Sequence, residues 1–189
     1  MKKYFLLAVA LSPLCSSCET DDETLKNETR NSTTTLHVGK YSDHIAIYRN
    51  CINTFTYNRS KLFQENMNAF EIHVNNSIQG EQGYQPFNFH TFAQLQVVPY
   101  NVLSQLTYSD NFKVQLTRIL NNQGLNADKG SFATSEYNLL NTLSILHNDT
   151  DDRDWKKHNR TIAFAYGAQY SFKQAVLYAG AIELSTYQQ

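Results

Sequence analysis

Residues 151–184 decide the fold, and they read DDRDWKKHNRTIAFAYGAQYSFKQAVLYAGAIEL. The stretch opens with carboxylates, which favour the positive end of a helix dipole, and continues with apolar residues on more than one helical face. Small residues lie among the apolar ones: Ala163, Gly167, Ala168, Ala175, Ala179 and Gly180. Helices that are apolar on most sides and carry small residues are approached closely by their neighbours. The stretch therefore predicts one long, central C-terminal helix over residues 151–184.

Apolar residues also recur at helical spacing upstream of this stretch, which predicts several further helices. The expected starting residues are Ser42, Ser60, Phe89, Ser109 and either Ser131 or Thr134. Pro99 must either kink the apolar segment 89–106 or divide it into two short helices, because its ring clashes with the preceding turn. The sequence thus predicts an all-α fold, a single irregular bundle of about five to seven helices.

The first eighteen residues are expected to be a secretory signal rather than part of the fold. A basic start, Met1-Lys2-Lys3, precedes an apolar run from Tyr4 to Leu11. A run of this length is far short of the roughly 20 residues that a membrane-spanning helix needs. We therefore assign residues 1–18 to a signal peptide.

The end of this signal resembles the lipobox of bacterial lipoproteins. Leu14, Ser16 and Ser17 precede Cys18, so that small residues stand next to the cysteine. The resemblance implies that a diacylglycerol is attached to Cys18, which becomes the new N-terminus. Cys15 is the alternative attachment site, although Leu14 before it is a poor fit to the small position. Lipid chains would then anchor the protein to a membrane without a spanning helix.

An acidic cluster, Glu19-Thr20-Asp21-Asp22-Glu23, follows the cysteine. It resembles the surface-export signal of Bacteroidota lipoproteins, which implies display on the outer face of the outer membrane. A periplasm-facing lipoprotein and an ordinary solvated acidic tail are the alternatives. Residues 19–41 are polar without a hydrophobic period and are expected to form a disordered tether, which leaves residues 42–189 as the helical domain.

The charge balance excludes one class of partner. The full chain carries 16 Lys and Arg against 17 Asp and Glu, a net charge of -1. Removal of residues 1–18 takes away Lys2 and Lys3, so 14 basic residues remain against 17 acidic ones, a net charge of -3. Proteins that bind nucleic acid carry a basic surplus, so we expect no nucleic-acid partner.

No established catalytic or cofactor motif is apparent, so we expect no catalytic residue, cofactor or metal ligand. Cys51 is expected to be a buried, inert thiol, and the lone residues His44, His73 and His90 to be partly buried polar groups. A loose cation site is the alternative use of the acidic residues Asp149, Asp151 and Asp152. Asp154 and His158 share a helix face, so they could act together, although a surface pair explains the spacing equally well.

Three functions remain open from the sequence. The first is a non-catalytic binding module at the cell envelope, for which an exposed cluster among the twelve tyrosines and Trp155 would form the contact face toward a protein or glycan. The second is an immunity or inhibitor lipoprotein directed against a toxin or lytic enzyme. The third is an enzyme with an unfamiliar site around Asp154, His158 and Tyr166.

Overall fold

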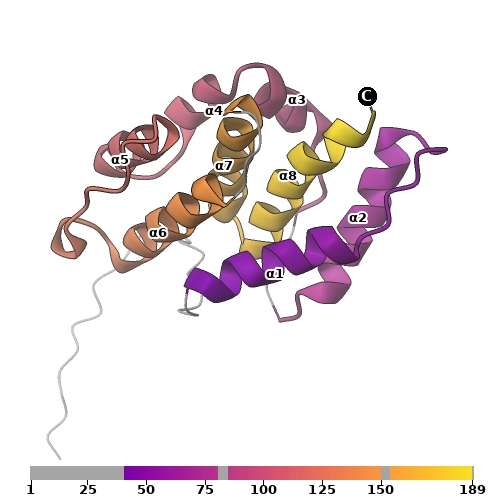
Figure 1. Ribbon diagram of the computed structural model, residues 1–189, viewed down its shortest axis with the longest axis horizontal. Coiled ribbons are helices and arrows are strands. Elements are labelled where there is room, and N and C mark those ends of the chain that lie inside the picture. The colour runs from indigo at the N-terminus through magenta and orange to yellow at the C-terminus, as the bar shows by residue number, and fades with distance from the viewer. Residues whose placement is uncertain (1–40, 81–84, 150–153, 189) are drawn as a thin grey trace, which may run out of the picture. The chain divides into compact units, whose positions relative to one another are not determined.

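The computed structural model describes residues 41–80, 85–149 and 154–188, and over these residues it is helical throughout (Figure 1). The helices are α1 (Tyr41–Thr54), α2 (Phe63–Ser77), α3 (Phe89–Val97), α4 (Pro99–Gln105), α5 (Asp110–Leu120), α6 (Thr134–Asn148), α7 (Asp154–Ala168) and α8 (Phe172–Ser185). Two short 3-10 turns, η1 (Lys129–Ser131) and η2 (Thr186–Gln188), complete the described part of the chain. The all-α bundle predicted from the sequence is confirmed, with eight α-helices in the described ranges.

The prediction of one long C-terminal helix is wrong, because two helices occupy that stretch. α7 ends at Ala168 and α8 begins at Phe172. Ser171 caps α8: its Oγ accepts a hydrogen bond of 3.1 Å from the backbone N–H of Gln174. A Cβ atom added to Gly167 would overlap the backbone of Gln174, so only glycine allows the two helices to approach this closely. Residues 154–185 therefore form a helical hairpin.

The hairpin lies at the centre of the bundle, as expected for the predicted helix. Every residue of α8 from Phe172 to Ile182 is buried, and α8 packs on α1, α2, α3 and α7 (Figure 1). A Cβ atom on Gly180 would lie 2.5 Å from the ring of Phe70 on α2. Small residues thus let α8 pack closely against α7 on one side and α2 on another.

Of the other predicted helix starts, some lie at the expected residues and others do not. Ser109 caps α5, since its Oγ accepts from the backbone N–H of Phe112 at 3.2 Å. Pro99 divides the third segment and occupies the first turn of α4, where its missing N–H costs nothing. Ser60, however, is not the cap of α2, which begins after Leu62; the Leu62 N–H donates to Oε2 of Glu65 at 2.9 Å.

The predicted signal peptide, Cys15, Cys18 and residues 19–40 of the predicted tether lie outside the described residues; Tyr41, the last residue assigned to the tether, instead begins α1. Among the residues that are described, no helix has both the length and the apolar character that a membrane crossing requires.

Candidate functional site

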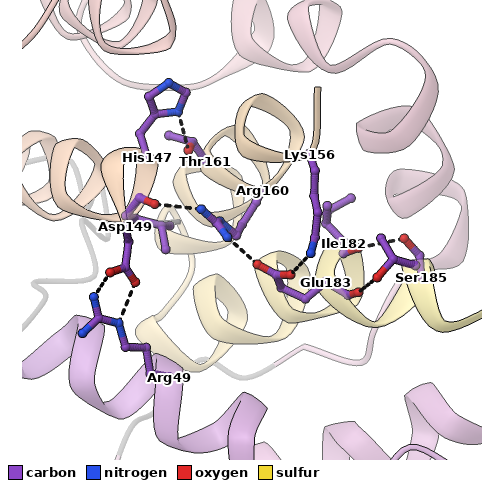
Figure 2. A network of polar contacts seen from close by, with 11 residues as sticks. Arg49, His147, Asp149, Lys156, Arg160, Thr161, Ile182, Glu183 and Ser185 are labelled. Atoms are coloured by element: carbon purple, nitrogen blue, oxygen red, sulfur yellow. Dashed lines mark hydrogen bonds and ion pairs between the residues drawn. The ribbon is translucent and has the colours of Figure 1, made fainter. Parts of the chain in front are cut away.

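A charge network around the buried Arg160 joins the hairpin to α6, and its other members are the half-buried Lys156 and Glu183 (Figure 2). Arg160 is 1% exposed, and its Nη1 donates to Oε1 of Glu183 at 2.5 Å. Its Nη2 donates to the carbonyl oxygen of Leu146 at 2.9 Å. Lys156 Nζ lies 2.6 Å from the second oxygen of Glu183. The carboxylate is therefore balanced by two cations, which makes the network a connection between helices rather than an open anionic site.

Asp149, one of the three residues of the suggested cation site, is paired with an arginine (Figure 2). Arg49 Nε donates to Oδ2 of Asp149 at 2.6 Å, and Nη2 of the same arginine contacts Oδ1. This pair joins α1 to the end of α6. The other two residues of the suggested site, Asp151 and Asp152, lie outside the described residues. Within the described ranges, no group of three or more His, Cys, Asp or Glu side chains is placed to hold a metal ion.

His147, in the last turn of α6, and His158, on α7, pack between helices. His147 is 1% exposed, and its Nδ1 lies 3.2 Å from Oγ1 of Thr161 (Figure 2). The His147 ring stacks on the ring of His158, with a centroid distance of 5.5 Å and an interplanar angle of 16°. Nδ1 of His158 lies 3.3 Å from the hydroxyl oxygen of Tyr100. No sequence pattern predicted the buried position of His147, because its contacts come from another helix.

The suggested catalytic group is not assembled by the described residues. His158 and Tyr166 are eight residues apart on α7, which places them about 12 Å apart along its axis. Tyr166 contacts Tyr170 and Tyr178 instead of the histidine. The third residue, Asp154, begins α7, but its side chain lies outside what the structure describes.

Cys51 is fully buried, as predicted, and burial raises the pKa of its thiol while a hydrogen bond with Ser77 lowers it to a smaller extent. His73 Nε2 lies 3.1 Å from the carbonyl oxygen of Cys51 and so serves the backbone rather than the thiol. His44 and His73 are half-buried, in line with the prediction. His90 is exposed, which corrects the prediction for that residue, because it lies on the outer side of the short helix α3.

A recess of about 250 Å³ opens between α3, α4 and the last turns of α7. We call it the tyrosine recess, and its polar lining comprises Gln94, Gln105, Thr107, Tyr166, Gln169 and Tyr170. Thr91 of α3 and Val102 of α4 complete its wall. Its position follows from Pro99, because α3 and α4 separate at that residue while both continue to contact α7.

Two tyrosines of the lining, Tyr166 and Tyr170, are packed in succession with the buried Tyr178 behind them. The Tyr170 hydroxyl donates to the Tyr166 hydroxyl at 3.4 Å, and the two rings meet at 62°. Tyr166 in turn meets the ring of Tyr178 edge to face, with centroids 5.1 Å apart. The hydrogen bond with Tyr166 raises the pKa of Tyr170 to about 12, and burial raises the pKa of Tyr178 to about 12. Tyr170 and Tyr178 are therefore neutral hydrogen-bonding groups at physiological pH.

Gln169 fixes the recess to the turn between the hairpin helices. Its Oε1 accepts from the backbone N–H of Thr107 at 2.7 Å and from the Thr107 hydroxyl at 2.8 Å. Its Nε2 donates to the carbonyl oxygen of Tyr166 at 3.1 Å. The loop before α5 is thus held against the end of α7, and this contact gives the recess one fixed wall.

A second surface feature lies at the other end of the same helices. We call it the aromatic face, and it consists of Val97, Tyr100, Trp155 and His158. The exposed fractions are 78% for Val97, 47% for Tyr100 and 45% for Trp155. Trp155 and His158 are three residues apart on α7 and so are neighbours on its surface, and Tyr100 contacts His158.

Comparison of the chain with family models, with curated proteins and with solved structures finds no match. The roles of these residues therefore follow from their contacts, exposure and chemistry.

Proposed function

We propose that the chain is a non-catalytic interaction module that a lipid on Cys18 holds at the outer membrane, on the cell surface. The observation that supports a binding role is the aromatic face, in which Val97, Tyr100 and Trp155, the single tryptophan of the sequence, are all exposed. Tryptophan and tyrosine dominate the energetics of protein contacts, because they bury a large area at a small cost in conformational entropy.

The aromatic face is also held in place before any partner arrives. The Tyr100 hydroxyl contacts His158, whose ring stacks on the buried ring of His147. Asn159, which is buried, donates to the carbonyl oxygen of Gln96 at 3.0 Å and so fixes the residue next to Val97. A surface that is ordered in the free protein loses less entropy on binding, which favours affinity.

Site-directed photo-crosslinking in whole cells tests the binding role. A photoreactive amino acid at position 97 is expected to give one discrete adduct with an envelope protein, and Trp155→Ala should reduce its yield at least fivefold. The matched control is position 72 on α2, where Ile72 is 62% exposed. Equal adducts at positions 97 and 72, or no adduct at 97, would contradict the proposal. A toxin or lytic enzyme as the adduct, inhibited by this chain, would identify the immunity role.

Intact-mass analysis of membrane-fraction protein, together with protease treatment of whole cells, tests the anchor. We expect a chain that begins at Cys18, carries two or three acyl chains and is removed by the protease. An unmodified chain would contradict the lipoprotein proposal, and an acylated chain that resists the protease would place it on the periplasmic side.

A further inference from the structure

We infer that the tyrosine recess binds an uncharged, hydroxyl-rich ligand of one sugar ring, either free or at the end of a glycan. This inference concerns a different site from the aromatic face, and it does not depend on the function proposed above.

The charge of the lining selects a neutral ligand. None of the residues that line the recess is Asp, Glu, Lys, Arg or His. Tyr170 remains protonated at physiological pH, since its pKa is raised to about 12. A charged ligand would give up hydration in the recess without gaining a counter-charge, which is unfavourable.

The hydrogen-bonding capacity of the lining selects hydroxyl groups. Gln94 and Gln105 each supply a carboxamide that both donates and accepts, and Tyr166 and Tyr170 supply hydroxyls that do the same. Sugar hydroxyls likewise donate and accept, so one ring can satisfy several of these groups at once. Gln94 Nε2 also lies 3.3 Å from Nε2 of His90, and the two tyrosine hydroxyls bond each other, but each of these groups has further hydrogen-bonding capacity that a purely apolar ligand would leave unused, at a cost for each group that loses water.

The aromatic rings and the size of the recess favour a sugar over other polar molecules. The rings of Tyr166 and Tyr170 meet at 62° and are held by their mutual hydrogen bond. Tyrosine rings are rigid apolar surfaces with a polar end, which suits the C–H faces and hydroxyl edges of a sugar. The volume of about 250 Å³ is slightly below the 300–1,000 Å³ of sites for drug-sized ligands, and so accommodates one ring rather than several.

The recess is held in shape without a ligand. Gln169 bonds to Thr107 across the opening between α7 and the loop before α5. The next residue of that loop, Tyr108, donates from its hydroxyl to the carbonyl oxygen of Ala165 at 3.1 Å. Both contacts fix the wall against α7, so a ligand does not have to order it.

Titration followed by amide NMR of the full chain, in a detergent without a sugar headgroup, tests the inference. The neutral probes are the methyl glycosides of glucose, galactose, mannose and N-acetylglucosamine; the charged probes are glucuronic acid and glucosamine. At least one neutral probe should give saturable shifts at the backbone amides of Thr107 and Gln169, with at least tenfold weaker binding of both charged probes. Absence of saturable shifts with all four neutral probes, or equal binding of a charged one, would overturn the inference.

Two variants assign the binding to the recess. Gln105→Ala should weaken binding at least fivefold, and Gln64→Ala, at an exposed glutamine of α2, should leave it unchanged. Equal binding by the Gln105→Ala variant and the parent chain would also overturn the inference. A disaccharide of the preferred sugar separates the two sources: equal affinity for the glycoside and the disaccharide indicates a single ring, and tighter binding of the disaccharide indicates the end of a glycan.

Discussion

At the scale of single residues, Arg160 joins three helices, and no motif around it in the sequence predicts this role. It is 1% exposed, it donates to Glu183 on α8, and it also satisfies the carbonyl oxygen of Leu146 near the end of α6. A buried ion pair stabilises a fold only modestly relative to apolar residues of the same shape. Removal of Arg160 alone is a different matter, because Glu183 would then be balanced by Lys156 only and the carbonyl oxygen of Leu146 would lose its donor.

Replacement Arg160→Met is therefore expected to lower the free energy of unfolding by about 3 kcal/mol. The matched control is Lys156→Met, because Lys156 binds the same carboxylate but its side chain is 17% exposed. This change should cost about 1 kcal/mol or less. Urea unfolding of both variants measures the difference. Equal losses would show that Arg160 is no more important than the partly exposed lysine.

Cys51 offers a second prediction at this scale. The thiol is fully buried and its pKa is raised by burial, so both access and thiolate formation are suppressed in the folded state. Alkylation of Cys51 by iodoacetamide at neutral pH should therefore require unfolding, and its rate should rise with urea in parallel with the unfolded fraction. Peptide mass spectrometry separates Cys51 from Cys15 and Cys18. Rapid labelling without urea would contradict the burial.

At the scale of elements, the break between α7 and α8 is the feature that the sequence prediction missed. The hydrophobic pattern runs through residues 169–171 without interruption, so periodicity indicated one helix. A local signal was present: Ser171 is followed three residues later by Gln174, which is the pattern of a helix N-terminus. The hydrogen bond from the Thr107 hydroxyl to Gln169 fixes the turn between the two helices. It joins residues that are 62 positions apart, so no local sequence pattern predicts it.

The substitution Ser171→Ala distinguishes the hairpin from a continuous helix by the sign of its effect. In the hairpin, Ser171 is a helix cap, and its loss should lower the free energy of unfolding by about 1 kcal/mol. In a continuous helix, alanine would be the better helix former and would stabilise the chain. Urea unfolding gives the sign, and a stabilised Ser171→Ala variant would contradict the hairpin.

The substitution Gly167→Ala tests how closely the two helices approach. Alanine in a helix interior normally stabilises by about 0.5–1 kcal/mol relative to glycine. Here the added methyl group would overlap the backbone of Gln174, so we expect a loss of about 3 kcal/mol or more. In Gly130→Ala, by comparison, the nearest neighbour of the new Cβ is an Asp128 oxygen at 3.8 Å. Thermal unfolding should show a large decrease for the first variant and little change for the second.

At the scale of the whole molecule, features that are set by neighbouring residues were predictable from the sequence, and features that are set by tertiary contacts were not. The sequence was sufficient for the all-helical class, for the start of α5 at Ser109 and for a kink or division at Pro99, because caps and proline act on their own neighbours. The surface features were not predictable in the same way. The aromatic face and the tyrosine recess each combine residues of α3 or α4 with residues of α7, and only tertiary packing brings these together.

The buried phenols predict how the folded state responds to alkali. The pKa values of Tyr170 and Tyr178 are each raised to about 12 from an ordinary value of 10.0, and burial also raises the pKa of Tyr108. The unfolded chain loses these protons first, so the folded state binds more protons above pH 10. The free energy of unfolding should therefore fall as the pH rises from 10 toward 12. Urea unfolding at each pH, with tyrosinate absorbance alongside, measures this decrease.

The central position of α8 has a consequence for how the protein is made. The ribosome synthesises α8 after every helix that packs on it, so α1, α2 and α3 emerge before the surface that buries their apolar sides exists. The nascent chain therefore cannot complete its core before α8 has been synthesised. Under the export proposed above, folding would wait until the hairpin has crossed the membrane.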